Sequence, residues 1–555
     1  MSINSALTMA VNAMQVNQLS LNVVQNNVAN MNTEGYSKQR VNLGTRVIGG
    51  ASSAFNINTQ AYRNAGVQIN SISRYSNEYL TEYYRNNNSK LSYSQTSSEI
   101  ASRITTLMDE LSDGGLSKAF DEFYTAVTNL QQKPTDNTAR MDYVEKANNV
   151  AILMNSKYKD LTAYRETLVG DGGSTSLEAS QLVDNVNKAN TLLEDLATVN
   201  SRIVSSGTLN SAANNLYDQR DAILTELSGY LDIKTSIDAN GVASVTLDGW
   251  DLVRHTTVSG KINVEPNNTV EDADRAILSL VNPADGKVLK SNLKDNINGG
   301  SIGAILEMGG KSDTSLTVQS SIDLLNDLAK GFAEVLNEIQ TQGWNADGTP
   351  DTNATSYAMA ISKDADGNVI LVSPTEKLFV TSDGSREITA GNIMVNTNLR
   401  NDVSGLAVAK VTRDAGTPAL DPADPKNGFF ETLAGGGYTL SNETDRFGVG
   451  NGKNMIDVLA TRDSTKNASL QNLTPEDFLM SGISKIGILA DSIENQGETQ
   501  ESIAQSIGDQ LKSETSVDLN EELTDMIKYQ RSYEASARVF NTCCDILNVL
   551  VNLGA

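Results

Sequence analysis

The chain has 555 residues, of which 39% are hydrophobic and 5% aromatic, and its formal net charge is −25 at pH 7. This length allows several domains. Such an acidic balance disfavours nucleic acid, whose binding proteins need a basic footprint, and it disfavours anionic membrane surfaces. No apolar run approaches the roughly 18 residues of a membrane-spanning helix, so we expect no membrane insertion.

The N-terminal segment predicts a long helix with one apolar stripe. Residues 1–33 contain no charge, no glycine and no proline, and the absence of helix breakers over this length favours one continuous helix. Apolar residues recur there at alternating spacings of four and three, which keeps one helix face toward a partner helix. The stripe consists of Ile3, Leu7, Ala10, Met14, Leu21, Val24, Val28 and Met31, with Asn17 as its polar position.

The C-terminal segment repeats this pattern. Residues 509–553 contain no glycine and no proline. The same spacing selects Leu519, Leu523, Met526, Gln530, Tyr533, Ala537, Phe540, Cys544, Leu547 and Val551. We interpret the two stripes as surfaces through which the terminal helices pair, with each other or with copies in an assembly. A terminal helix that packs only on its own domain is the alternative.

Helices dominate the first half of the chain. A turn is expected at residues 32–37, with Gly35 as its pivot, and short strands follow to about residue 70. From residue 71 to residue 231, apolar residues at helical spacing predict a bundle of long helices, broken at glycine pairs and at Pro134.

Two segments change period to that of strands. Residues from about 233 to 300 predict a small β element, because Asn240-Gly241 and Asp248-Gly249 are typical of hairpin turns. A helix is expected again at residues 320–342. Residues 345–450 hold most of the prolines and short apolar runs such as residues 369–372, which predicts a second, mostly β domain.

The predicted architecture is mainly α with inserted β, and it is nested. The terminal coiled-coil helices form one domain, a long-helix bundle lies within it in the sequence, and a mostly-β domain is innermost. The expected boundaries are residues 1–65 plus 505–555 for the terminal domain, 66–344 plus 451–504 for the helical bundle domain, and 345–450 for the inserted β-rich outer domain.

No motif in the sequence indicates catalysis or a resident cofactor. His255 is the single histidine, and Cys543 and Cys544 are adjacent in the last apolar stripe, so soft metal ions find few ligands. Gly310-Lys311-Ser312 lacks the upstream glycine of a phosphate-binding loop. Asp364, Asp366 and Asn368 begin like a calcium loop, but its later glycine and glutamate are missing. We therefore expect no catalytic residue, no metal and no cofactor.

Residues 26–41, NNVANMNTEGYSKQRV, resemble the N-terminal signature of the bacterial flagellar rod, hook and hook-associated proteins. The likeness is carried by Asn26, Asn27, Ala29, Asn30, Asn32, Thr33, Gly35, Tyr36 and Ser37. Glu34 departs from it, since proline is frequent there in the family. The C-terminal helix is similar to the matching helix of the family through Glu521, Tyr529, Gln530, Tyr533, Ala535, Ala537 and Arg538.

The middle of the chain distinguishes the members of this family. Residues 216–230, LYDQRDAILTELSGY, resemble a helix of the hook-associated member found where hook and filament meet, and residues 299–303 followed by Leu306 resemble it too. Hook and distal-rod proteins share the terminal segments but lack the long bundle at residues 71–231. They stay as an alternative, and an enzyme in the β insertion is a weaker one.

The resemblance implies a structural, non-catalytic protein of the bacterial flagellum. It implies export by the flagellar type III system without a cleaved signal peptide, and an extracellular location at the hook–filament junction. The paired terminal helices would form an inner tube in a ring of copies. The implied partners are the chain itself, the hook protein below, a second hook-associated junction protein above, and a cytosolic export chaperone on the C-terminal helix.

Overall fold

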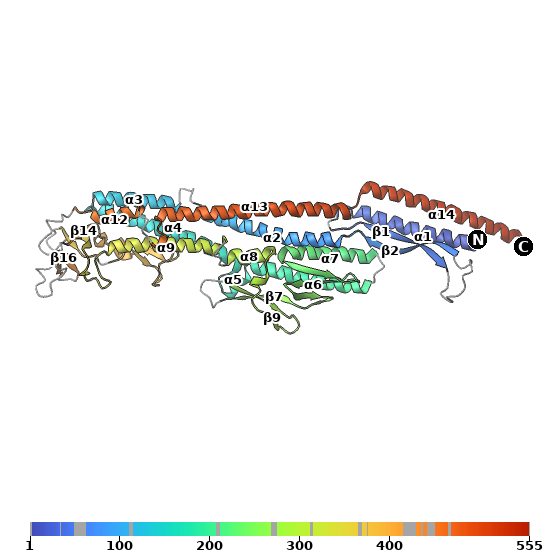
Figure 1. Ribbon diagram of the computed structural model, residues 1–555, viewed down its shortest axis with the longest axis horizontal. Coiled ribbons are helices and arrows are strands. Elements are labelled where there is room, and N and C mark those ends of the chain that lie inside the picture. The colour runs from blue at the N-terminus through green and yellow to red at the C-terminus, as the bar shows by residue number, and fades with distance from the viewer. Residues whose placement is uncertain are drawn as a thin grey trace.

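The computed structural model describes residues 3–33, 35–48, 63–109, 115–206, 211–267, 275–310, 315–363, 369–374, 376–413, 429–433, 437–440, 450–463 and 468–553. Figure 1 shows an elongated molecule with both chain ends at one tip. We call the elements at that tip the terminal part and the remainder the body. The predicted mainly α architecture with inserted β sheets is confirmed.

The terminal part contains the first and last helices and a β-hairpin. Helix α1 (Ile3–Ala29) packs side by side with α14 (Leu519–Leu553) (Figure 1). Strands β1 (Gln39–Ile48) and β2 (Arg63–Arg74) pair antiparallel and lie against α1. The predicted long terminal helices are present, and within one chain they pair with each other.

The prediction that helix begins at residue 71 is wrong. Residues 71–74 continue β2, and Gln39 pairs with Arg74 at the end of the hairpin. Helix α2 (Glu78–Leu107) begins only after Asn77, whose side chain accepts a hydrogen bond from the Leu80 amide as an N-cap. The apolar residues Val67 and Ile69 alternate with polar ones as in a strand with one covered face, and the strand continues past a register shift near residue 70 to Arg74.

Two long helices lie in the part of the body next to the terminal part (Figure 1). Helix α13 (Pro475–Thr515) lies antiparallel to α2, because Gly508 is beside Tyr84 while Gly497 is beside Ser94. The body contains further helices: α3 (Leu116–Gln132), α4 (Asn137–Val169), α5 (Ser174–Glu178), α6 (Gln181–Ser206), α7 (Ser211–Tyr230), α8 (Gly300–Gly309), α9 (Val318–Gln340), α10 (Thr397–Asn401) and α12 (Lys453–Asp463).

Two small antiparallel sheets flank α6 and α7, as predicted for residues 233–300. One has the order β3-β4-β5-β6, with β3 at Ile233–Ile237, β4 at Ala243–Leu247, β5 at Trp250–Arg254 and β6 at Thr257–Val258. The other is β7-β8-β9, with Lys261–Pro266, Ala276–Val281 and Val288–Lys290. Both predicted hairpin turns are confirmed, since Gly241, Asp248 and Gly249 have positive φ.

The far end of the body carries a five-stranded sheet in the order β14-β10-β11-β16-β15. Its strands are β10 (Ser356–Lys363), β11 (Val369–Val372), β14 (Ala409–Thr412), β15 (Phe430–Thr432) and β16 (Tyr438–Leu440). Strands β12 (Phe379–Thr381) and β13 (Ile393–Val395) pair separately. The predicted strand at residues 369–372 is confirmed as β11.

The expected domain boundaries at residues 65 and 505 do not coincide with ends of elements. Residues 66–74 belong to β2, and α13 continues through residue 505 to Thr515. The division into three domains therefore stays a prediction.

Close backbone contact explains why glycine stands at the start of α8. Gly300 has φ +69, and a Cβ placed on it would overlap the backbone of Tyr230, the last residue of α7. We predict that Gly300→Ala lowers the free energy of unfolding by more than about 3 kcal/mol. Gly249→Ala is the matched control, because Gly249 also has positive φ but faces open space, so only backbone strain of about 1–2 kcal/mol is expected. Chemical denaturation measures both, and equal losses would contradict the steric explanation.

Candidate functional site

Helix α1 buries a face that is offset from the predicted stripe. Of the predicted residues, Ala10 and Val24 are buried and Met31 is exposed, while the others are half-buried: Ile3, Leu7, Met14, Leu21 and Val28. The remaining buried residues are Val16, Ser20, Val23 and Asn27. Asn17, Leu21, Val24 and Val28 each follow one of these buried residues, so the packed face is rotated by about one residue and includes polar groups.

Helix α14 keeps much of its apolar surface in solvent. Its half-buried predicted residues are Met526, Tyr529, Ala537, Phe540, Cys544 and Leu547. The predicted residues Leu519, Leu523, Gln530, Tyr533 and Val551 are exposed, and so are Ile527, Val539, Ile546 and Val549. Cys543, and not Cys544, is the buried cysteine. Helix α1 therefore covers only part of the apolar surface that the sequence places on α14.

Asn27, a signature residue in the last turn of α1, connects three segments of the terminal part. Its Oδ1 accepts hydrogen bonds from the Tyr36 hydroxyl (2.8 Å) and the Gln39 amide (2.9 Å), and its Nδ2 donates to the Gln39 carbonyl (2.9 Å) and Glu522 Oε2 (3.0 Å). The side chain is 1% exposed and uses its full hydrogen-bonding capacity. One amide thereby joins α1, β1 and α14.

The other signature residues form the last turn of α1 and the chain reversal that follows it. Asn30 donates to Asn26, and Thr33 donates to Asn30. Gly35 has φ +78, as a turn pivot requires. Ala29 and Asn32 are exposed, and Ser37 is buried. The signature therefore marks the end of α1 and its return into β1.

Tyr36 lies between two carboxylates. Its burial, together with the negative charges of Asp218 and Glu522, raises its pKa from the ordinary value of 10.0 to about 12. The hydroxyl is therefore a proton donor to Asn27 over the whole physiological pH range.

Lys38, directly before β1, forms ion pairs with the start of α14. Its ammonium lies 2.7 Å from Glu521 Oε2 and 3.2 Å from Glu522 Oε1, and its amide donates to the Thr515 carbonyl at the end of α13. Burial lowers the pKa of Lys38, but hydrogen bonds with Glu521 and Glu522 outweigh it and raise the pKa above its ordinary value. Glu522 is 2% exposed, so the ion pair between Lys38 and Glu522 is shielded from solvent.

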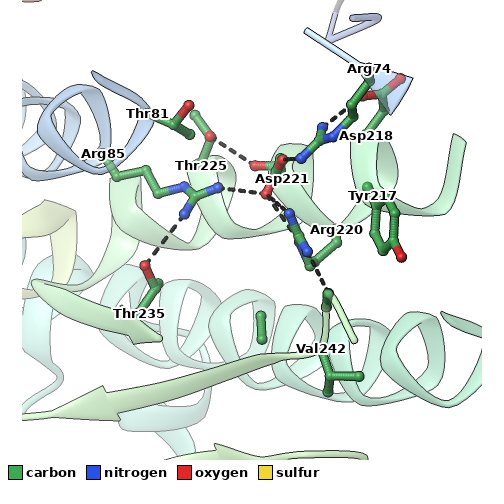
Figure 2. Close-up of polar contacts among 12 residues, drawn as sticks. Arg74, Thr81, Arg85, Tyr217, Asp218, Arg220, Asp221, Thr225, Thr235 and Val242 are labelled. Atoms are coloured by element: carbon green, nitrogen blue, oxygen red, sulfur yellow. Dashed lines mark hydrogen bonds and ion pairs between the residues drawn. The ribbon is translucent and has the colours of Figure 1, made fainter. Parts of the chain in front are cut away.

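A second charged cluster lies where the terminal part meets the body. Figure 2 shows Arg74, Arg85 and Arg220 converging on Asp221 of α7. Asp218 lies one turn earlier and pairs with Arg74 at 2.8 Å. Both aspartates belong to the Asp-Gln-Arg-Asp sequence of α7.

Comparison with known proteins shows which flagellar proteins the chain is similar to. The "Flagellar hook-associated protein FlgK helical domain" matches residues 101–354. Curated proteins named flagellar hook-associated protein 1 match almost end to end, at 24% identity in Bacillus subtilis (97% of this chain, 96% of that protein) and 23% in Salmonella typhimurium (99% and 100%). Over nearly its whole length, the chain is similar to the flagellar hook-associated protein 1 (FlgK) proteins.

The terminal segments match families of wider scope. Residues 7–36 match the "Flagella basal body rod protein" family, and residues 513–553 match the "Flagellar basal body rod FlgEFG protein C-terminal" family. The fold is similar to that of the flagellar hook junction protein FlgK from Burkholderia pseudomallei, with a TM-score of 0.54 and 16% identity over 78% of this chain and 100% of that chain.

Sequence reasoning missed the charged residues that hold the site together. Glu522 is separated from its partner Asn27 by 495 positions, and no periodic pattern reports such a contact. The Asp-Gln-Arg-Asp sequence drew attention to α7, but only as a family likeness. Three charged residues in this four-residue sequence, next to the apolar residues of α7, are the signal that could have indicated a buried ion network.

The other candidate sites of the sequence lie only partly within the described residues. His255 is exposed and lies 3.6 Å from Asp238. In the described ranges, no group of histidine, cysteine, aspartate and glutamate could hold a metal ion, and no helix there is long and apolar enough to cross a membrane. Gly310 is described, but Lys311 and Ser312 are not, and Asp364, Asp366 and Asn368 also lie outside the described residues.

The bridging amide of Asn27 gives a direct prediction. Asn27→Asp removes both donated hydrogen bonds and places a carboxylate beside Glu522, so the free energy of unfolding of the terminal part should fall by about 2–4 kcal/mol. Hydrogen exchange of α1 and α14 measures this loss. Asn32→Asp is the control, since Asn32 is exposed in the same turn, and an equal effect of both variants would refute the bridging role.

The raised pKa of Tyr36 predicts a loss of stability at high pH. Above pH 10 the unfolded chain releases the phenolic proton while the folded chain keeps it up to about pH 12, so the unfolded state binds fewer protons and unfolding becomes easier as pH rises. The free energy of unfolding of Tyr36→Phe should therefore fall less steeply between pH 10 and 12 than that of the wild type. Tyr79→Phe, at an exposed ring, serves as control, and identical slopes for all three chains would contradict the assignment.

Proposed function

We propose that the chain is a structural component of the bacterial flagellum that forms the junction between hook and filament. It assembles as a ring of copies through its paired terminal helices. The observation that carries the proposal is the apolar surface of α14 that α1 leaves exposed, which includes Leu523 and Ile527 at 43% and 54%. Exposed apolar side chains in such a row are typical of a surface that a partner covers.

Similarity to named flagellar proteins supports the place of this assembly. The relatives are named hook-associated proteins, and the solved relative is named a hook junction protein. The helical-domain match at residues 101–354 favours this role over that of a hook or distal-rod protein, which we keep as the second candidate because the terminal segments match rod families. We propose a non-catalytic role.

The proposed partners follow from the axial position of a junction. The ring contacts the hook protein below and a second hook-associated protein above, outside the cell. The chain reaches this place through the flagellar type III system without a cleaved signal peptide. Before export, a cytosolic chaperone covers the exposed apolar face of α14, because that face would otherwise drive premature association.

Deletion of the gene in its host tests the proposal. Electron microscopy should show hooks without filaments, and an immunoblot of the medium should show shed flagellin. Complementation with Leu523→Asp should fail in the same way, because the charge lies on the face that neighbours cover. The purified variant should keep the thermal unfolding midpoint of the wild type, since Leu523 is exposed in the lone chain.

Val204→Asp is the matched control for this experiment, because Val204 is similarly exposed but lies on α6 of the body. It should restore filaments. Normal filaments in the deletion strain would refute the junction role, and missing hooks would favour the rod or hook alternative. Filaments restored by Leu523→Asp would refute assembly through this face of α14.

A further inference from the structure

We propose that Asp218 and Asp221 of α7 are positioning residues that fix the orientation of the terminal part relative to the body. The two carboxylates act as a clamp on Arg74 and on the backbone amide of Ser37, the last signature residue. The inference concerns contacts within one chain and holds or fails independently of the proposed function.

The chain itself constrains this orientation only weakly. The terminal part is joined to the body at two places, where β2 passes into α2 around Asn77 and where α13 passes into α14 through residues 516–518. Short links of this kind fix a distance and leave an angle free. A fixed angle needs side contacts between the two parts, and α7 reaches β2 at this level.

Asp221 is anchored on the body side of the joint. Its Oδ1 accepts from Arg85 of α2 at 2.8 Å and from Arg220 at 2.9 Å, while its Oδ2 pairs with Arg74 of β2. The side chains of Arg85 and Arg220 are 4% and 3% exposed. Guanidinium groups stay charged when buried, so two arginines of the body hold the carboxylate whose other oxygen faces the terminal part (Figure 2).

Asp218 contacts only the terminal part. Its Oδ1 accepts from Arg74 Nη1 at 2.8 Å, and its Oδ2 accepts from the Ser37 amide at 3.3 Å. Arg74 thus uses both terminal nitrogens to bridge two carboxylates that are one helical turn apart. A planar guanidinium held at two points fixes direction as well as distance.

The electrostatics of the two aspartates agree with these separate roles. Burial opposes ionisation of Asp221, but the charges of Arg74, Arg220 and Arg85 hold its pKa below the ordinary value. Burial dominates at Asp218 and raises its pKa despite the contact with Arg74. Asp221 is therefore the firmly ionised anchor, and Asp218 is the weaker contact at the edge of the cluster.

Because Asp221 and Asp218 have different partners, their variants should separate the orientation of the terminal part from the stability of the body. Replacement of Asp221 should disturb both parts, because Arg85 and Arg220 lose their partner. Asp218→Asn should affect the joint alone. The amide carries no charge, and its NH2 group takes the place of one carboxylate oxygen, so that it faces the donor of either Arg74 or Ser37 without accepting from it. Asp218→Glu keeps the charge and should restore part of the clamp.

Electron spin resonance on the purified 555-residue chain tests the clamp. Spin labels on cysteines replacing Val549 of α14 and Val204 of α6, both exposed, report the distance between the two parts once Cys543 and Cys544 are changed to alanine. The wild-type distance distribution should be narrow. Asp218→Asn should broaden it at least twofold with no change in the thermal unfolding midpoint of the body, and Asp218→Glu should reverse at least half of the broadening.

Asp195→Asn provides the control, because Asp195 is an exposed carboxylate on the neighbouring helix α6. It should leave the distribution unchanged. A broad wild-type distribution, or an unchanged width in Asp218→Asn, would overturn the proposal. Broadening that comes with a lower unfolding midpoint of the body would overturn it as well, since Asp218 would then act through overall stability.

Discussion

The pairing of the first and last helices constrains the whole molecule. Because α1 and α14 lie side by side at one tip (Figure 1), the chain between them must leave the tip and return to it. The outward path runs through the hairpin and α2, and the return path is α13, a helix of 41 residues, or about 60 Å at 1.5 Å per residue. The nested order of helix ends, bundle and β insertion is the sequence counterpart of this path.

Polar contacts, more than apolar ones, define how the ends meet. The buried face of α1 includes Ser20 and Asn27, and a helix pair of this kind gains less from the hydrophobic effect than a leucine-rich one. The Asn27 amide and the Lys38 ammonium compensate by requiring specific partners on α14. A slipped pairing would leave these buried groups unsatisfied, so they favour a single alignment of the two helices.

The sequence predicted the parts of this fold that depend on local pattern. The long terminal helices, the two hairpin turns and strand β11 follow from spacing and turn residues. The extent of β2 was missed, because the apolar alternation breaks after Ile69 at a register shift, and residues up to Arg74 are strand only through their pairing with β1. The rotation of the buried face of α1 was missed for a related reason: a 4-3 repeat gives the periodicity of a stripe, whereas the partners β2 and Glu522 decide which neighbouring residues are covered.

The candidate site combines residues that no sequence pattern brings together. The signature turn and the Asp-Gln-Arg-Asp helix were noted separately, and the contact between the Ser37 amide and Asp218 joins them across 181 positions. Apolar periodicity carries no information on such pairs, because a single buried charge is satisfied by one partner anywhere in the chain. Apolar periodicity also could not predict which side of α14 stays exposed, since the stripe alone does not say which α14 residues another molecule covers.

We propose above all that neighbouring molecules cover the apolar face of α14 that α1 leaves open. Electron cryomicroscopy of the hook–filament junction on intact flagella tests it most directly. Our account predicts terminal helices at the innermost radius, with Leu523 and Ile527 packed against adjacent subunits. A map in which this face of α14 lies against solvent, or in which the body alone makes the contacts between subunits, would contradict it.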